Sequence, residues 1–344
     1  MAVLFPMFEE GAYKVSVLIP VYGVEQYIER CARSLFEQTY SNLEFVFVND
    51  CTHDRSMDIL QQVLEDYPKR KASVKIVNHE KNRGLAAARN TALDNATGEF
   101  VSHVDSDDWL EVNAIASLVK RQQETNADIV SGNMYVHTIN GMEKYHEPLY
   151  ESKDQRILRQ LPPSCDHNVI RRIIRRSLYE NNRIRCIDGC NMGEDLYTMV
   201  QLCWYADAIA TIDGFVYHYD LNRPDSYTRE SNDEKRLNNH MQLVRNWAGV
   251  VEFLSDKGEA FYRSAVSNMA DCVKEAMRLA LKFKSKACFE ELAALIYGNK
   301  ALMEIIGWRN TGFRSFSQSY PMMWMKNSAN RAAGYVRYKF KGKQ

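Results

Sequence analysis

Residues 15 to 21 read Val15-Ser16-Val17-Leu18-Ile19-Pro20-Val21, an apolar run rich in β-branched residues that ends just before Gly23. Such a run predicts a strand buried on both faces of a parallel sheet. The following residues 25–38 carry apolar side chains at the spacing of one helix face, at Ile28, Cys31, Leu35 and Phe36. A buried strand followed by an amphipathic helix is the repeating unit of an α/β fold.

The same alternation continues along the chain. Further strands are predicted at 43–48, 74–78 and 100–104, and further helices at 56–67 and 85–96. This order predicts an α/β fold, in which a mostly parallel sheet carries helices on both faces. Farther along, residues 109–124 are expected to be helix-like, residues 135–150 more polar and irregular, and residues 168–182 helical. From about residue 233 to residue 303 the pattern becomes long and helical. We therefore expect two regions, residues 1–230 and residues 231–344, with a boundary near 230.

The bulk composition indicates a globular protein without a membrane span. Formal net charge is zero, but the 40 residues after Glu304 contain eight Lys or Arg and no acid. The first 304 residues therefore carry 36 basic (44 − 8) and 44 acidic side chains, a net of −8. No apolar run reaches 18 residues, and the apolar start lacks the basic region of a signal peptide. The eight cysteines form no paired framework, so we expect reduced thiols and a cytoplasmic location.

Three carboxylates crowd the end of the predicted strand at 100–104. They are Asp105, Asp107 and Asp108, followed by Trp109. Packing like charges together costs free energy unless a cation lies between them. Carboxylate oxygens suit Mg²⁺ or Mn²⁺, which in many sites also bind a diphosphate. The alternative interpretation is a solvated polar turn.

Other polar segments follow the remaining strands. They are Pro20-Val-Tyr22, Asn49-Asp50 with Asp54, and Asn82-Arg-Gly84 with Ala88-Arg-Asn90. Because open α/β sheets bind ligands at the carboxyl ends of their strands, we expect these segments to line one crevice. Farther along, Gly193-Glu-Asp195 opens a predicted helix and Tyr217-His-Tyr219 ends a predicted strand.

With these motifs in this order, residues 14–230 resemble glycosyltransferase family 2. The resemblance implies the Rossmann-like GT-A fold and an inverting, metal-dependent transfer of a sugar. The implied donor is a nucleotide-sugar, expected to be a UDP-sugar. The implied acceptor is a hydroxyl of a glycan or of a lipid-linked saccharide, and the implied cofactor is Mg²⁺ or Mn²⁺.

The resemblance also implies roles for single residues. Asp50 would accept a hydrogen bond from a uracil-like base, and Arg89 would point toward the base or the phosphates. Gly84 would let the backbone approach the nucleotide. The other implied nucleotide-binding residues are Pro20, Val21, Tyr22, Asn82, Asp105 and Ser106. The implied metal ligands are Asp107, Asp105 and His218. Purely structural roles stay open, namely an Asx turn for Asp50, a surface arginine for Arg89 and a packed histidine for His218.

Asp195 is the candidate general base. Attack on an anomeric carbon requires a group that deprotonates the acceptor hydroxyl, and one carboxylate facing the leaving group gives inversion. The alternative is an acid pair, Glu194 and Asp195, that only stabilises the first turn of a helix through its dipole.

Two basic segments remain without a settled role. Residues 320–340 form a predicted amphipathic helix with Trp, Met and basic side chains, which suits peripheral contact with the inner face of a cell membrane. A helix that closes the domain is the alternative, and no nucleic-acid fold precedes it. Arg171, Arg172, Arg175 and Arg176 are expected on one helix face within 168–182, facing a phosphate, solvent or acids.

Two other functions compete with glycosyl transfer. A nucleotidyltransferase is disfavoured because no Gly-rich basic loop follows the first strand. A degenerate member that binds sugar nucleotides or acts as a scaffold is disfavoured because Asp105, Asp107 and Asp195 are all present. The sequence names neither the sugar, nor the acceptor, nor the oligomeric state.

Overall fold

The computed structural model describes residues 13–149, 152–161, 168–222 and 233–306. The first part of the chain contains, in order, β1 (Val15–Val21), α1 (Ile28–Phe36), β2 (Leu43–Asn49), α2 (Ser56–Asp66), the 3₁₀ helix η1 (Pro68–Ser73), β3 (Val74–Asn78), α3 (Leu85–Asp94), β4 (Phe100–His103), β5 (Trp109–Leu110) and α4 (Ala114–Thr125). It continues with β6 (Ile129–Thr138), β7 (Gly141–Tyr145), α5 (Lys153–Gln160), β8 (Arg172–Arg175), α6 (Arg176–Asn181), α7 (Glu194–Tyr205) and β9 (Ile209–Asp220).

Within the described residues, nine strands form one mixed sheet in the order β3-β2-β1-β4-β8-β6-β9-β5, with β7 paired to β6. The first four strands of this order pair in parallel, as does β6 with β9. Strand β8 is antiparallel to both β4 and β6 and joins the two parallel parts. The carboxyl ends of β1, β2 and β4 therefore lie at one edge, as the sequence predicted.

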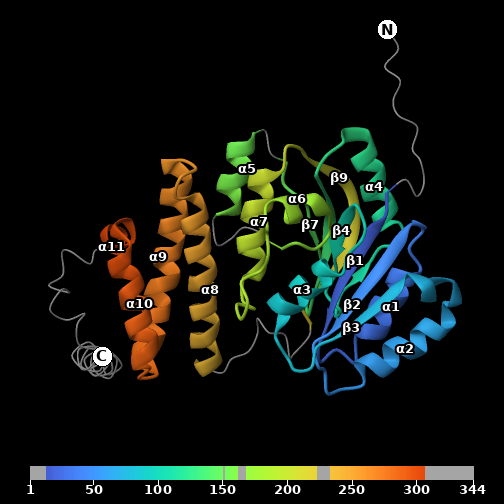
Figure 1. Ribbon diagram of the computed structural model, residues 1–344, viewed down its shortest axis with the longest axis horizontal. Coiled ribbons are helices and arrows are strands. Elements are labelled where there is room, and N and C mark those ends of the chain that lie inside the picture. The colour runs from blue at the N-terminus through green and yellow to red at the C-terminus, as the bar shows by residue number, and fades with distance from the viewer. Residues whose placement is uncertain (1–12, 150–151, 162–167, 223–232, 307–344) are drawn as a thin grey trace, which may run out of the picture. The chain divides into compact units, whose positions relative to one another are not determined.

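Helices cover both faces of the sheet (Figure 1), which confirms the expected α/β fold. Every side chain of β1 is buried. Because successive side chains of a strand point to opposite faces, Val15, Val17 and Ile19 pack with α1, α2 and α4, whereas Leu18 packs with α3, α6 and α7. These two cores fix the sheet edge at which the polar segments meet.

Three local predictions were wrong. Residues 109–124, expected as one helix-like segment, begin with the two-residue strand β5 before α4 starts at Ala114. Residues 135–150, expected to be irregular, contain the end of β6 and its hairpin partner β7. Residues 168–182, expected as a helix, contain strand β8 followed by the short helix α6. In each case strand pairing between distant segments outweighs the local pattern.

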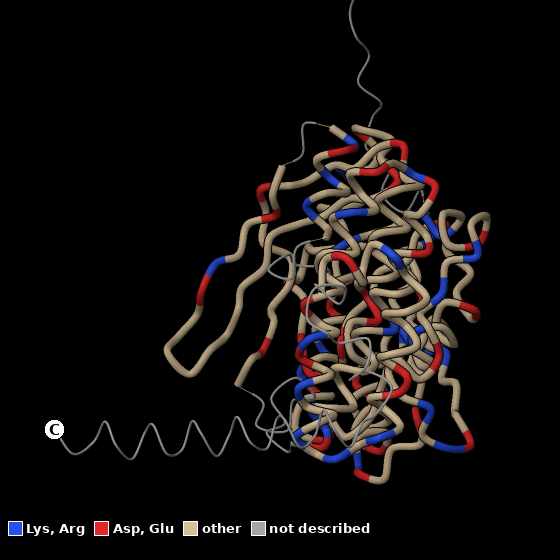
Figure 2. Tube along the Cα trace, turned by 90° about the vertical axis from the view of Figure 1, so that its left-hand side faces the viewer, with Lys and Arg blue, Asp and Glu red and all other residues tan. Residues whose placement is uncertain are grey.

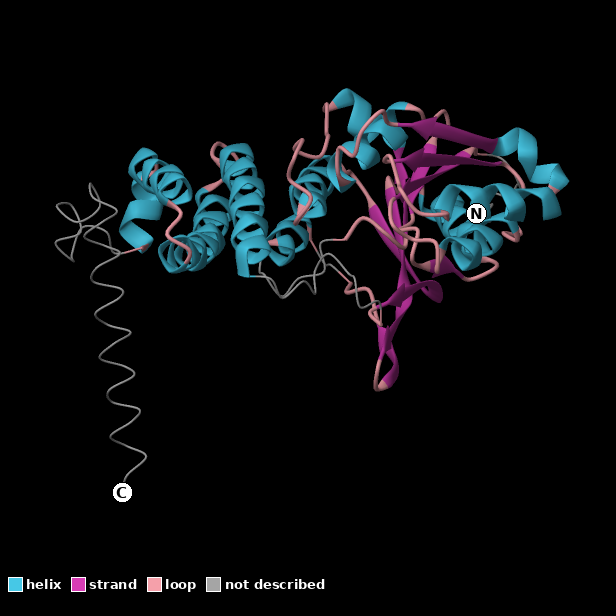
Figure 3. Cartoon of the chain, turned by 90° about the horizontal axis from the view of Figure 1, so that it is seen from below, coloured by secondary structure: helices cyan, strands magenta, loops and turns pink. Residues whose placement is uncertain are grey.

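The described residues after 232 form a helical unit with its own core. It contains α8 (Asp233–Leu254), α9 (Glu259–Lys282), α10 (Lys286–Gly298) and α11 (Lys300–Ile305), and it carries no strand (Figure 3). Contacts divide the chain into this unit and the sheet-bearing unit near residue 230. The fully buried side chains of the helical unit include Val250, Met269 and Leu292.

Charge and hydropathy patterns of the described residues add two findings. Acidic and basic residues are interspersed along the trace (Figure 2). None of the described helices is long and apolar enough to cross a membrane. The amphipathic helix predicted at 320–340 lies outside the described residues.

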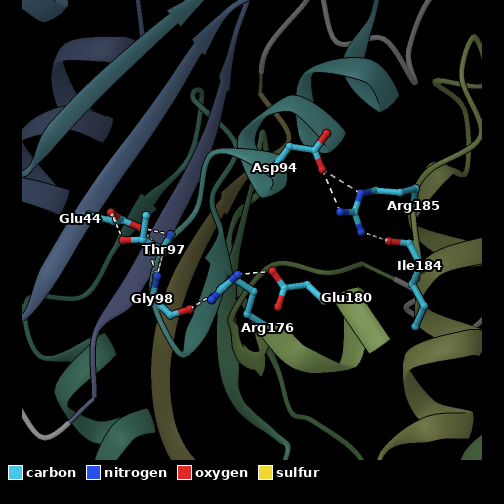
Figure 4. Close-up of polar contacts among 9 residues, drawn as sticks. Glu44, Asp94, Thr97, Gly98, Arg176, Glu180, Ile184 and Arg185 are labelled. Atoms are coloured by element: carbon cyan, nitrogen blue, oxygen red, sulfur yellow. Dashed lines mark hydrogen bonds and ion pairs between the residues drawn. The ribbon is translucent and has the colours of Figure 1, made fainter. Parts of the chain in front are cut away.

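Glu44 lies on β2 and binds residues at the start of β1 and just before β4. These contacts predict that the stability of the fold depends on pH. The Glu44 carboxylate accepts hydrogen bonds from Ser16 and, at 2.8 Å, from Lys14. The Thr97 hydroxyl donates to the same carboxylate at 2.8 Å (Figure 4). Burial alone would raise the pKa of Glu44, but these donors lower it to about 2. A depressed acid pKa stabilises the fold above the unfolded value of about 4.3, and that stabilisation is lost as the pH falls toward 2.

Glu44→Gln is therefore expected to lower the free energy of unfolding at pH 7 by about 1–2 kcal/mol, less than the full shift implies because the carboxylate is partly solvated. Urea unfolding at pH 7, 5 and 3 should show the difference from wild type shrinking with acidity. Glu65→Gln, at an exposed ion pair with Lys71, is the control and should change little. A Glu44→Gln deficit that is the same at pH 7 and pH 3 would contradict the prediction.

Candidate functional site

Asp50 lies buried at the end of β2 and organises the loop before α3. Its Oδ1 accepts the backbone N–H of Arg83 at 2.8 Å and lies 2.7 Å from His79 Nδ1. Its Oδ2 accepts the backbone N–H of Gly84 at 2.7 Å. A carboxylate offers about four acceptor positions, so three protein partners leave about one for a ligand. Asp50 is thus the structural anchor that an Asx-type interpretation suggests, and its contact with a base edge stays a prediction.

The segments flanking Asp50 separate into buried and exposed residues. Pro20 and Val21 are buried in β1, and the Val21 carbonyl accepts the backbone N–H of Asp50 at 3.0 Å. Tyr22 is 47% exposed, and Asn82 is exposed before Gly84. The exposed ring of Tyr22 and the amide of Asn82 are therefore accessible to a ligand, whereas Pro20 and Val21 are buried.

Gly84 occupies a crowded position with a left-handed backbone conformation. Its φ is +88°, and a Cβ at this position would lie 2.3 Å from the Asn191 side chain. Asn191 in turn accepts the backbone N–H of Ala86 at 3.0 Å, in the first turn of α3. The space beside Gly84 is thus filled by Asn191 from the segment before α7. Close approach of a nucleotide to the Gly84 backbone stays a prediction.

Side chains of helix α3 form hydrogen bonds with the segment before α7, residues 185–191. Asn90 exchanges two hydrogen bonds of 2.9 Å with the backbone of Cys186. Arg185 donates to Asp94 at 2.8 and 3.0 Å (Figure 4). Together with Asn191, these contacts hold residues 185–191 against α3 and so fix where α7 begins.

Arg89 connects the two acidic parts of the site. It is only 4% exposed, which excludes a snorkelling surface arginine. Its Nη2 donates to Asp105 at 2.8 Å and its Nε donates to Glu194 at 3.2 Å. Arg89 therefore lies between the end of β4 and the start of α7. In this structure Nε and Nη2 point to these carboxylates, and a contact of Arg89 with a base or phosphates stays a prediction.

Glu194 and Asp195 occupy the first turn of α7, but they face different surroundings. Glu194 is 5% exposed beside Arg89, whereas the side chain of Asp195 is partly exposed. Burial and the neighbouring charge of Asp195 raise the pKa of Glu194, while the ion pair with Arg89 opposes the rise and favours the charged carboxylate. Gly193, with φ +73°, makes the turn that separates the pair from the preceding segment. The geometry thus leaves Asp195 as the more accessible carboxylate.

The three carboxylates after β4 are not equivalent. Asp108 is fully buried, where it accepts the Tyr217 hydroxyl at 2.8 Å and the backbone N–H of Asp220 at 2.8 Å. Asp105 keeps 26% of its side chain exposed, and Asp107 is partly exposed. Ser106 is buried between them. Asp108 therefore has a structural task, and Asp105 and Asp107 remain the carboxylates that a ligand can reach.

His218 is a packed histidine in this structure. Its ring stacks on Trp109 with centroids 4.6 Å apart. Its Nδ1 lies 2.9 Å from His137 Nε2, and its Nε2 lies 2.9 Å from Glu111 Oε1. Because protein groups engage both ring nitrogens, we do not retain His218 among the candidate metal ligands.

The carboxylate ligands at this sheet edge fit a metal ion that the protein holds only in part. Among the described residues, no three His, Cys, Asp or Glu side chains gather into a group that could hold an ion. Asp105 and Asp107 offer hard oxygen atoms at one sheet edge. Mg²⁺ is commonly held by one or two carboxylates, with water and substrate phosphates completing its shell. The residues present fit that arrangement.

The arginines at 171–176 do not form a helix face. Arg171 and Arg172 are buried and both pair with Glu147, Arg172 at 3.1 Å. Arg175 pairs with Asp128 at 2.8 Å, and Arg176 with Glu180 (Figure 4). The cluster therefore consists of acid-paired arginines that fasten β8. Sequence reasoning did not identify Glu147, because its nearest arginine partner is 24 residues away.

Sequence comparison identifies the family. The profile of the family described as "Glycosyl transferase family 2" matches residues 16–193. The curated protein "Uncharacterized glycosyltransferase EpsJ" of Bacillus subtilis is 30% identical over 254 residues, which cover 72% of this chain and 71% of that protein. The chain belongs to glycosyl transferase family 2. Other curated relatives of this family 2 chain match over only 20% to 39% of their own length.

Solved structures confirm the GT-A-like fold of this family 2 chain. Residues 1–349 of S. aureus TarS in complex with UDP align with a TM-score of 0.56 at 21% identity, covering 94% of this chain and 91% of that one. The mannosyltransferase PcManGT from Pyrobaculum calidifontis, in complex with GDP-Man and Mn²⁺, aligns with a TM-score of 0.52 at 18% identity, covering 94% and 89%.

Proposed function

We propose that the protein is an inverting, metal-dependent glycosyltransferase that moves a sugar from a nucleoside diphosphate donor, a UDP-sugar, to a hydroxyl of a glycan or lipid-linked saccharide. The observation that carries the proposal is the buried Arg89, which joins Asp105 at the end of β4 to Glu194 at the start of α7. It brings the acidic donor motif and the candidate base into one site. Residues 1–230 are then the catalytic domain and residues 231–344 the helical region.

The donor side follows from the strand ends. Asp50 has one acceptor position left for the N–H of a uracil ring, and Tyr22 presents an exposed ring on which a base can stack. Complexes of relatives with UDP and with GDP-Man and Mn²⁺ support a nucleotide-sugar as the ligand class. Asp105 and Asp107 would hold Mg²⁺ or Mn²⁺, which neutralises charge on the diphosphate leaving group.

The acceptor side rests on Asp195. Its partly exposed carboxylate would take the proton of the attacking hydroxyl, while the buried Glu194 is held by Arg89. A single carboxylate acting opposite the leaving group gives one displacement and inversion at the anomeric carbon.

Isothermal titration calorimetry with UDP tests the donor assignment. Binding is expected with Mn²⁺ present and is expected to weaken at least about tenfold with a chelator, because the carboxylates then face the diphosphate without a cation. Asp107→Asn should show weak binding under both conditions, and Asp188→Asn, at an exposed site, should behave as wild type. Tight binding that ignores the chelator would contradict the metal assignment. Donor binding without turnover of any UDP- or GDP-sugar would favour the degenerate member instead.

A further inference from the structure

Tyr219 lies on β9, two residues after Tyr217, which binds acidic residues of the loop that follows β4. Because side chains alternate along a strand, Tyr217 and Tyr219 point to one face of the sheet and His218 points to the other. The Tyr217 hydroxyl accepts the backbone N–H of Asp105 at 3.1 Å and donates to Asp108 at 2.8 Å. Tyr219 therefore stands on the face of the acidic residues, and His218 does not.

Residues on both sides of Tyr219 bind the same acid, Tyr217 through its side chain and Asp220 through its backbone. Asp108 Oδ2 accepts the hydroxyl of Tyr217, two residues before Tyr219. Asp108 Oδ1 accepts the backbone N–H of Asp220, the next residue, at 2.8 Å. The ring of Tyr219 also packs against the buried core. These contacts fix the position of Tyr219 along β9 and pack its ring against the core.

The hydroxyl of Tyr219 makes no hydrogen bond within the described part of the protein. The hydroxyl of Tyr217 nearby, by contrast, has two hydrogen-bond partners. Burial raises the pKa of Tyr219, followed by the charges of Asp108, Asp105, Asp107 and Asp195. A phenol in these surroundings keeps its proton and acts as a hydrogen-bond donor.

Four acids influence the hydroxyl of Tyr219 electrostatically. They belong to the two acidic segments of the proposed site, the loop after β4 and the start of α7. Tyr217, on the same face of β9 as Tyr219, binds the backbone of Asp105 and the carboxylate of Asp108 directly. The proposed function places the donor diphosphate on that side, beside Asp105 and Asp107. A protonated hydroxyl there needs an acceptor, and a diphosphate oxygen is the anionic acceptor that the reaction brings.

We propose that Tyr219 binds the donor, its hydroxyl donating a hydrogen bond to the diphosphate of the nucleotide-sugar. This rests on the proposed function, and it replaces His218 by Tyr219 as the side chain of the Tyr217-His-Tyr219 motif that meets the ligand. The contact contributes to affinity for the phosphate groups and adds nothing to recognition of the base.

Tyr219→Phe removes only the hydroxyl, and calorimetry can separate phosphate from base recognition. UDP, UMP, GDP and GMP are titrated into wild type and Tyr219→Phe with Mn²⁺ present. Tyr219→Phe is expected to bind the favoured diphosphate about ten- to a hundredfold more weakly, the usual effect of a hydrogen bond to a charged group. The monophosphate with the same base should bind both proteins equally. Tyr135→Phe is the matched control, because Tyr135 is the sheet neighbour of His218 on the opposite face.

Each other outcome has a defined meaning. Equal diphosphate affinity in wild type and Tyr219→Phe overturns the Tyr219 proposal. Equal losses for mono- and diphosphate with a lowered melting temperature indicate a purely structural hydroxyl, and also overturn it. A wild-type protein that binds neither diphosphate contradicts the proposed function itself, whatever Tyr219→Phe does.

Discussion

Asp195→Asn is expected to lower the turnover number for glycosyl transfer by at least about a thousandfold while donor affinity changes less than about threefold. The amide keeps the size of the carboxylate but cannot take a proton from the acceptor hydroxyl, and general base catalysis accounts for about 10²–10⁴ in rate. Donor affinity survives because the proposed donor contacts lie at Asp50, Asp105 and Asp107, and Arg89 still holds Glu194.

Initial rates with saturating donor, paired with calorimetry on UDP, measure the two effects separately. Asp188→Asn is the control, since Asp188 is an exposed acid in the segment before α7. Equal losses of transfer and of donor affinity would assign Asp195 to donor binding. Retained transfer would move the base role elsewhere, with Glu194 the next carboxylate to test.

Arg89→Met is expected to destabilise the protein by about 3–5 kcal/mol and to weaken donor binding. Removing one partner from a buried ion pair leaves uncompensated buried charge, and Arg89 serves both Asp105 and Glu194. Donor binding falls because Asp105 loses the contact that holds its carboxylate at the end of β4. Chemical unfolding and UDP calorimetry are the measurements.

Arg185→Met is the matched control for Arg89→Met. Arg185 pairs with Asp94 at 2.8 Å, but its side chain is 34% exposed and that of Asp94 57%. Exposed pairs contribute about 0–1 kcal/mol, so little change is expected. The double variant Arg89→Met with Glu194→Gln should recover part of the lost stability, because one buried charge has been removed. Equal effects of Arg89→Met and Arg185→Met would contradict a connecting role for Arg89.

The elements that the sequence predicted well are those with strong local patterns. The β1 run is buried throughout, and helix α7 begins at the predicted Glu-Asp pair. Long apolar runs and regular helix spacing report burial directly, so they identify elements without tertiary information. Segment 172–175 carries no such pattern, and its strand exists because β4 and β6 pair with it on either side.

The candidate site divides in the same way. Asp50, Asp105, Asp107 and Asp195 could be selected from sequence, because polar residues at strand ends and helix starts indicate ligand sites in α/β folds. The residues that these side chains contact could not be selected from the sequence. Asn191 beside Gly84, Glu147 between two arginines and Glu194 beside Arg89 all involve residues 24 to 107 positions apart.

The sequence by itself determined the family, the alternation of strands and helices, and the set of acidic residues at one sheet edge. The tertiary structure decided which of these residues still have side-chain atoms that a ligand could reach. Asp108 and His218 lie in motifs as specific as that of Asp107, yet protein groups take up the carboxylate of the first and both ring nitrogens of the second. The type of each side chain can be read from the sequence. Whether its hydrogen-bonding atoms are already occupied depends on neighbours that the fold brings close, and only the three-dimensional structure shows those neighbours.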